Sequence, residues 1–143
     1  MDISNKKLLS VVGPRMVNEY WNDIRSCLYD LLDRAPDTWK VEDVYMDIMT
    51  GSSVLYIAED EDGLKGFTIL KPFQQYGDLV IHIWIAYNKR EHDNFLFAMD
   101  EVKDIAESMG ARYITFSSKR KGCLRLCNEI GFVPSHQHFI YEV

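Results

Sequence analysis

Apolar side chains recur at helical spacing in two stretches near the start of the chain. The first stretch follows Pro14, which suits the first turn of a helix because its missing N–H needs no partner there, and it ends at Pro36. The second has Glu42 and Asp43 at its start, where carboxylates favour the helix dipole, and it ends at Gly51. The spacing predicts two helices, each with one buried face. The apolar positions are Val17, Tyr20, Trp21, Ile24, Leu28, Leu31 and Leu32, then Val41, Val44, Tyr45, Ile48 and Met49.

Strand-forming runs lie before and after these helices. We predict a short first strand over residues 7–12 and two further strands over 53–59 and 64–72. The turn signal at 60–63 joins the latter two into a hairpin. Residues 79–86 are nearly all apolar, which is typical of a central strand covered on both faces.

The second half of the chain alternates helices and strands. We predict a helix over 94–109, a strand over 112–117, a helix over 119–129 and a last strand over 137–143. A strand-helix-strand unit implies a right-handed crossover, so the fourth and fifth strands are expected to be parallel. The predicted order is β-α-α-β-β-β-α-β-α-β, an α/β fold with a mixed sheet and helices on both faces.

Composition narrows the class of protein. A length of 143 residues fits a single domain over 1–143, and 47% hydrophobic content is ordinary for a globular chain. A net charge of -6 does not favour nucleic acid, and the longest apolar run is too short to span a bilayer. Three cysteines, an odd number, suit a reducing interior. We therefore expect a cytoplasmic protein with no nucleic-acid or membrane partner.

Two short stretches connect the predicted order to a known family. Residues 58–67 read AEDEDGLKGF, and residues 126–132 read LCNEIGF. The first resembles a hairpin motif, and the second the C-terminal LYxxxGF signature, of the GNAT superfamily of acyl-CoA-dependent N-acyltransferases. The order of elements resembles that family over nearly the whole chain. Several small phage proteins also resemble this fold, and the length would suit one; such a protein would act in the host cytoplasm.

The resemblance implies a donor, an acceptor and an assembly. Acetyl-CoA would slot between the fourth and fifth strands, with its pantetheine along Ile83, Trp84 and Ile85. The acceptor would be a small-molecule or protein amine, which the sequence does not identify. Because members of the family are often dimers, a homodimer is also expected.

In the family, a loop reading Arg/Gln-x-x-Gly-x-Gly/Ala holds the pyrophosphate. Arg90 stands at its first position, but the glycine positions fall on Asp93 and Phe95. Glycine lets backbone approach a phosphate without a Cβ, whereas Asp93 brings a negative charge. Asp93 or Asn94 also suits the cap of the following helix. We therefore expect a degenerate phosphate loop.

Basic residues follow both parallel strands. Lys89 and Arg90 follow the fourth, and Lys119, Arg120 and Lys121 follow the fifth, at the edge where α/β sheets bind ligands. Cations at the start of a helix oppose its dipole, so they either hold an anion such as the phosphates of CoA or belong to a solvated loop. If CoA binds, we expect Arg90 and the cluster 119–121 to carry more of the phosphate contact than the backbone does.

The resemblance also implies direct attack by an amine on the thioester, with a base and an acid, often a tyrosine, to move protons. The tyrosine position is Cys127, on a helix whose neighbours also fit a core. His82 is a candidate base, although a histidine there also fits a purely structural role. We expect His82 and Trp84 to share one face of the fourth strand. The opposite face is expected to carry Ile81, Ile83 and Ile85.

Two other interpretations stay open. The missing glycines and tyrosine fit a catalytically degenerate scaffold that binds a host protein, because fold does not imply function. Cys123, Cys127, His136 and His138 are ligand types that suit zinc, but their spacing is not that of a usual finger. We expect no metal.

Overall fold

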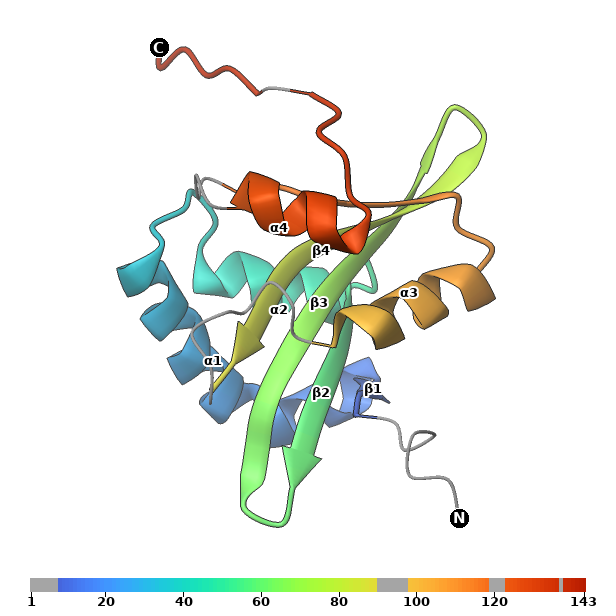
Figure 1. Ribbon diagram of the computed structural model, residues 1–143. Helices are drawn as coiled ribbons and strands as arrows, with labels where there is room; N and C mark the ends of the chain where they lie inside the picture. Colours follow the sequence, from blue (N-terminus) through green and yellow to red (C-terminus); the bar gives the residue numbers. More distant parts are fainter. Residues whose placement is uncertain (1–7, 90–97, 119–122, 137) are drawn as a thin grey trace.

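The computed structural model describes residues 8–89, 98–118, 123–136 and 138–143 (Figure 1). A 3-10 turn at Pro14–Met16 leads into the first helix. The strands are β1 (Ser10–Val12), β2 (Val54–Asp60), β3 (Gly63–Gln75), β4 (Asp78–Asn88) and β5 (Tyr113–Phe116). The helices are α1 (Val17–Arg34), α2 (Val41–Met49), α3 (Met99–Ser108) and α4 (Cys123–Ile130).

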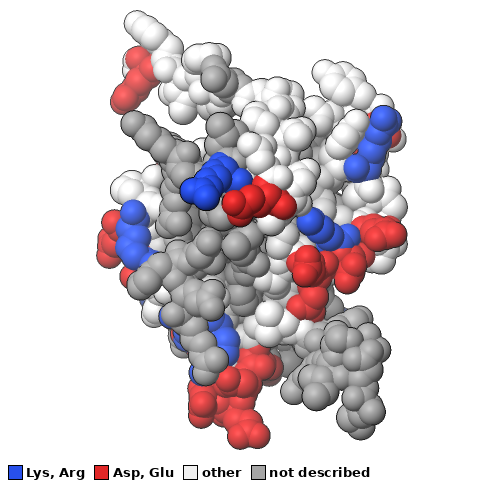
Figure 2. Space-filling model, in the orientation of Figure 1, with Lys and Arg blue, Asp and Glu red and all other residues white. Residues whose placement is uncertain are grey.

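The strands form one mixed sheet in the order β1-β2-β3-β4-β5. The first three pairings are antiparallel, and β4 pairs with β5 in parallel across the α3 crossover. The predicted hairpin between the second and third strands and the predicted parallel pair are both confirmed. Figure 2 shows carboxylates gathered at the turn between β2 and β3, where Asp60, Glu61 and Asp62 are exposed.

Helices cover both faces of the sheet, as the sequence predicted (Figure 1). On one face, α1 and α2 pack against β2 and β3, and Leu28, Ile48 and Phe67 there are almost fully buried. On the other face, Val102 of α3 packs with Ile81 of β4. Burying a side chain of this size contributes about 1.5–3 kcal/mol, so each face is held by its own apolar cluster.

Local signals set the ends of α2 and α3. The carboxylate of Asp43 accepts the backbone N–H of Lys40 at 3.0 Å, which satisfies a donor at the start of α2. The end of α3 is followed by Gly110 at φ 77, a left-handed conformation that glycine adopts without steric cost. Residues 94–97 of the helix predicted over 94–109 lie outside the described residues.

The predicted last strand is the main error in the element order. Residues 138–143 form no strand, and their side chains are exposed. A run of strand-forming residues becomes a strand only when another strand pairs with it. Within the part of the chain that the structure describes, none pairs with this segment. Among the same residues, none of the helices is long and apolar enough to cross a membrane.

Candidate active site

A β-bulge lies in β4 at Trp84. Leu70 of β3 pairs with Ile83, and Ile69 pairs with Ile85, so Trp84 is the extra residue on β4. Ile83 packs in the cluster under α3, whereas Trp84 and Ile85 both contact the cluster under α1 and α2. A bulge bends its strand and increases the local twist. The direction of β4 therefore changes at Trp84.

The bulge overturns one prediction about faces. Ile81 and Ile83 do share a face, but Ile85 lies on the opposite one, with Trp84. The prediction assumed an uninterrupted alternation, and one extra residue reverses the face of every side chain that follows it.

The pairing between β4 and β5 ends next to the bulge at Trp84. Their parallel pairs run from Val80–Tyr113 to Ile83–Phe116 and stop there. β4 continues past the bulge and remains paired with β3 on its other side. In the described parts of the chain, no strand pairs with 84–87 on the side of β5. An edge of this kind can hydrogen-bond an extended ligand through backbone N–H and C=O groups.

His82 stands beside this junction. Its Nδ1 lies 2.8 Å from Oγ1 of Thr115, its pairing partner on β5. When Nδ1 is the donor in that contact, Nε2 holds a lone pair, and no described residue hydrogen-bonds to Nε2. Partial burial and then the charge of Lys71 lower the pKa of His82 below its ordinary value of 6.5. The imidazole is therefore neutral at neutral pH, which is the form that a general base needs.

A cation, a ring and a carboxylate lie together next to His82. Lys71 is the pairing partner of His82 on β3. Its Nζ lies 3.6 Å from the centre of the Trp84 ring and 3.1 Å from Oδ2 of Asp47 on α2. Asp47 also accepts a hydrogen bond from the hydroxyl of Ser53. A π face and a carboxylate thus hold the ammonium of Lys71, whose charge acts on the imidazole of His82.

The sequence analysis did not identify Lys71, Asp47 or Thr115. Lys71 could have been found by continuing the register of the hairpin between β3 and β4 as far as His82. Asp47 lies on a helix distant in sequence, and its contact with Lys71 depends on how α2 packs over the sheet. Sequence spacing alone carries no signal for that contact.

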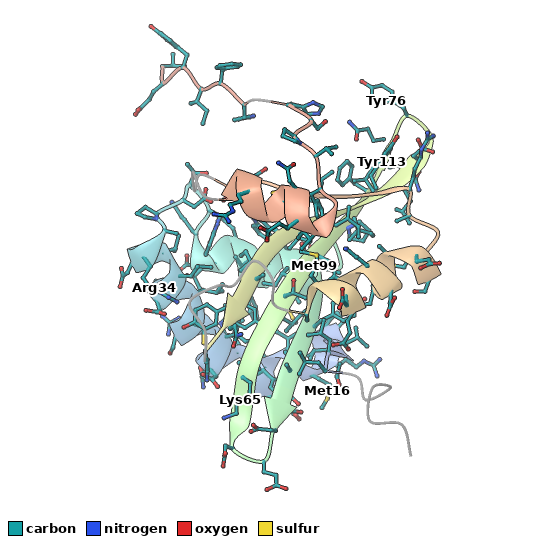
Figure 3. The ribbon with its side chains drawn as sticks, in the orientation of Figure 1. Met16, Arg34, Lys65, Tyr76, Met99 and Tyr113 are labelled. Carbon is teal, nitrogen blue, oxygen red and sulfur yellow. The ribbon has the colours of Figure 1, made fainter. Side chains whose placement is uncertain are left out.

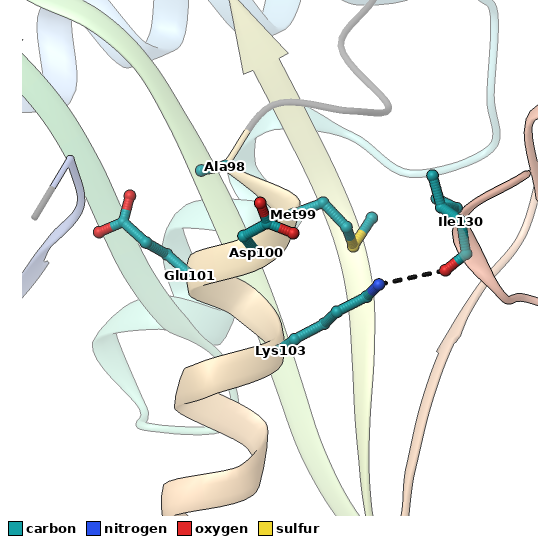
Figure 4. Close-up of a pocket in the computed structure, with 6 residues that line it drawn as sticks. All are labelled: Ala98, Met99, Asp100, Glu101, Lys103 and Ile130. Atoms are coloured by element: carbon teal, nitrogen blue, oxygen red, sulfur yellow. Dashed lines mark hydrogen bonds between the residues drawn. The ribbon is translucent and has the colours of Figure 1, made fainter. Parts of the chain in front are cut away.

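A shallow hollow of about 410 Å³ lies at the start of α3 (Figure 4). It is lined by Ala98, Met99, Asp100, Glu101, Lys103 and Ile130. The Nζ of Lys103 donates to the carbonyl of Ile130 at 3.1 Å. Oε1 of Glu101 accepts the backbone N–H groups of Leu8 and Leu9 at 2.8 and 3.0 Å. The described start of α3 is therefore acidic. Its carboxylates interact favourably with the positive end of the helix dipole, where an anionic ligand would otherwise bind.

The phosphate-binding prediction falls mostly on residues outside the described ranges. These residues are Arg90, Asp93, Asn94, Phe95, Lys119, Arg120 and Lys121. Lys89 is described, and its Nζ contacts the two carboxylate oxygens of Asp23 on α1 at 2.8 and 2.9 Å. Lys89 is thus engaged with α1, and the roles of the others stay predictions.

Cys127 is partly exposed on α4, whereas the sequence favoured a core position. Its carbonyl accepts the N–H of Phe132 at 2.8 Å and so closes the end of the helix. Its role as an acid stays a prediction. Among the described residues, no three His, Cys, Asp or Glu side chains gather as a metal site requires. His136 and His138 are both exposed, and the side chain of Cys123 is not described.

Comparison with solved structures shows that this chain shares its fold with several acetyltransferases and with a transcriptional regulator. A possible acetyltransferase from Clostridium difficile 630 matches with a TM-score of 0.71 and 10% identity, covering 96% of this chain and 99% of its own. An aminoglycoside acetyltransferase, meta-AAC0020, from an uncultured soil metagenomic sample, solved with sisomicin, matches with a TM-score of 0.68 and 12% identity over 99% of both chains. A transcriptional regulator from Bacillus halodurans C-125 matches with a TM-score of 0.70 and 15% identity, covering 94% and 98%.

No family model and no curated protein matches the sequence. The similarity to solved structures is therefore a similarity of fold, because these sequence identities are too low to indicate a substrate. The presence of proteins with different names among the neighbours agrees with the rule that one fold serves several functions.

Proposed function

We propose that this chain is an N-acyltransferase that moves an acetyl group from acetyl-CoA to an amine. The observation that carries this proposal is the end of β4–β5 pairing at Ile83–Phe116, next to the bulge at Trp84. Pantetheine is an extended chain with two amides, and the edge over 84–87 offers backbone partners for such a chain. The acetyltransferase names of several neighbours of the same fold support this proposal.

His82 is the proposed base. Bound acetyl-CoA supplies the thioester carbonyl, and an amine nitrogen attacks that carbon. As the C–N bond forms and the C–S bond breaks, Nε2 of His82 takes the proton that the nitrogen loses. The thiolate that leaves takes a proton from Cys127 or from water. Holding the amine and the thioester together supplies most of the rate enhancement, and a positioned base typically adds 10²–10⁴-fold.

The described residues fit the two ends of CoA unequally. The open edge of β4 suits pantetheine, but Asp100 and Glu101 at the start of α3 would repel phosphate. We therefore propose that side-chain cations in the segments 90–97 and 119–122, Arg90 above all, bind the phosphates in the place of a glycine loop.

Isothermal titration with acetyl-CoA, CoA, pantetheine and adenosine 3′,5′-bisphosphate tests the proposal. We expect heat with acetyl-CoA and CoA, and weaker binding of either fragment alone. No heat with either full ligand at near-millimolar concentration would refute binding. With a panel of amines, product formation followed by mass should fall at least ~10²-fold in kcat for His82→Gln. Unchanged CoA affinity in that variant would show that the site itself is intact.

The acidic start of α3 favours a second candidate, a scaffold of this fold that binds a protein and not CoA. Glu101 accepts hydrogen bonds from the amides of Leu8 and Leu9, so this end of α3 contacts the backbone just before β1. A pull-down with and without added CoA separates the candidates. A partner captured regardless of CoA, together with no heat in the titration, supports the scaffold; heat with acetyl-CoA contradicts it.

A further inference from the structure

His82 and Thr115 form a polar pair on neighbouring parallel strands. They are pairing partners in the ladder between β4 and β5, so both side chains lie on the same face of the sheet. Figure 3 shows Tyr113, where β5 begins, at the same end of the molecule as Tyr76 in the turn before β4, so the two strands enter the sheet together. Nδ1 of His82 and Oγ1 of Thr115 are 2.8 Å apart, and both residues are partly buried. A contact of this length is a hydrogen bond, and its direction decides what His82 can do.

The direction matters because a neutral imidazole carries one proton for two nitrogens, and a hydroxyl can donate or accept. If Thr115 accepts from Nδ1–H, Nε2 of His82 has a lone pair and can take a proton. If Thr115 donates to Nδ1, the proton of the ring is on Nε2, and His82 can only donate there. The same two residues therefore give either a base or a hydrogen-bond donor.

The charges around His82 favour the first direction. Nδ1 faces β5, and Lys71 lies on β3, the neighbour of β4 on the other side. In an imidazole Nε2 belongs to the ring edge opposite Nδ1, so the positive charge of Lys71 acts from the side of that nitrogen. A positive charge favours a lone pair over an N–H group, whose hydrogen is itself positive. The nearby carboxylate of Asp47 on α2 is held by Lys71 and by the hydroxyl of Ser53.

We propose that Thr115 is a positioning residue: its Oγ1 accepts the Nδ1–H of His82 and so keeps the lone pair on Nε2. Orientation of a base by a third group is a general requirement of catalysis by proton transfer. The role in proton transfer rests on the proposed function, whereas the tautomer does not. When Nε2 takes a proton from the attacking amine, Nδ1–H stays hydrogen-bonded to the oxygen of Thr115, which stabilises the imidazolium.

NMR of the ¹⁵N-labelled protein without CoA tests the tautomer, because protonated and unprotonated ring nitrogens have well-separated chemical shifts. Spectra are taken well above the lowered pKa of His82, and His82→Gln identifies its signals. We expect the proton on Nδ1 in the parent chain and in Thr115→Ser. In Thr115→Val the proton should move at least partly to Nε2, because an Nδ1–H that faces a methyl group has no acceptor. A parent His82 protonated on Nε2, or a tautomer that Thr115→Val leaves unchanged, overturns the proposal.

Thr68 provides a matched control within the sheet. Its hydroxyl donates to the carbonyl of Ile85 on β4 at 3.2 Å, so its hydrogen bond does not involve His82. Valine suits a strand as threonine does, so circular dichroism should show the fold of the parent in both valine variants. Thr68→Val should leave the tautomer of His82 unchanged. A change as large as that in Thr115→Val overturns the proposal, because it would come from the sheet as a whole.

Kinetics separate the tautomer from the proposed catalysis. If His82 is the base, kcat for acetyl transfer in Thr115→Val should fall at least ~10-fold with unchanged CoA affinity, and Thr115→Ser should stay within a few-fold of the parent. A changed tautomer in Thr115→Val with the kcat of the parent overturns the positioning role. A parent chain that binds no CoA refutes the proposed function instead, and the NMR spectra still decide the direction of the hydrogen bond.

Discussion

At the scale of single residues, the charge of Lys71, the pairing partner of His82, predicts a pH effect. Lys71→Met removes a positive charge that lowers the pKa of His82, so that pKa should rise, while burial still holds it down. If His82 is the base, activity is lost as pH falls through its pKa. The acid limb of kcat/KM should therefore move to higher pH in this variant. Lys71→Arg keeps the charge and should leave the limb in place.

Lys65 provides a matched control for that experiment. It lies on β3 like Lys71, but its Nζ pairs with Asp60 at 3.5 Å near the β2–β3 turn. Lys65→Met should leave the acid limb unchanged. An acid limb that is identical in the Lys71→Met and Lys65→Met variants would exclude the proposed influence of Lys71.

Tyr87 predicts a stability effect that does not depend on any activity. Its hydroxyl donates to Oδ2 of Asp30 at 2.7 Å, its ring stacks on Phe67, and it is only 7% exposed. Burial and then this hydrogen bond raise its pKa to about 12. Tyr87→Phe should lower the free energy of unfolding by about 0.5–1.5 kcal/mol near neutral pH.

The same residue fixes the sign of an alkaline effect. The pKa of Tyr87 is about 12 in the folded state and about 10 in the unfolded state. The protonated hydroxyl therefore contributes fully to the free energy of unfolding below pH 10, and this contribution is lost as pH rises toward 12. Denaturant unfolding at pH 9 and 11 should show a smaller loss of stability in Tyr87→Phe than in the parent. Tyr29→Phe, at a 43% exposed tyrosine, is the control. If Tyr87→Phe and Tyr29→Phe lose the same amount of stability between pH 9 and pH 11, the prediction is contradicted.

At the scale of elements, the bulge in β4 is the feature that a deletion can test. Removing Trp84 leaves Ile83 on the α3 side and Ile85 on the α1–α2 side, which is the alternation of a regular strand. The register with β3 is kept, and β5 gains room to pair further along β4. We expect the deletion to keep the circular dichroism of the parent, to cost about 3 kcal/mol or more in lost Trp packing, and to weaken CoA binding at least ~10-fold.

Trp84→Phe separates the loss of the ring from the loss of the extra residue. This substitution keeps the length of β4 and an aromatic face for Lys71, so CoA binding should stay within a few-fold of the parent. Titration calorimetry measures the affinity of both variants for CoA. A deletion variant that binds CoA as the parent does would show that the bulge does not open the edge.

Element order was largely readable from the sequence, and the exceptions share a cause. The helices at Val17–Arg34 and Val41–Met49 were predictable from the spacing of their apolar residues and from the residues at their ends. The bulge at Trp84 has no local signal, because it arises from the pairing of two strands. The strand predicted at the C terminus had the right local pattern, but none of the described strands pairs with residues 138–143.

The candidate site was predictable only in part, for the same reason. His82 and Trp84 were predicted on one face of the fourth strand from alternation alone. In the structure Lys71 pairs with His82 across the sheet, and its ammonium lies over the Trp84 ring. The carboxylate of Asp47 reaches Lys71 from α2, across a packing contact between distant segments. The charge environment of His82 is therefore a product of the assembled sheet and helix.

At the scale of the whole molecule, the homodimer that the family resemblance implies would make stability depend on protein concentration. Unfolding of a dimer releases two chains, so mass action raises the Tm as concentration rises. We expect the Tm of the full chain to increase over a hundredfold range of concentration, measured by scanning calorimetry at matched ionic strength. Because the apolar clusters on the two faces of the sheet draw on α1 to α4 and not on residues 138–143, a chain ending at residue 137 should still unfold cooperatively. A Tm of the full chain that does not change with concentration would mean that its folded state is complete within a single copy.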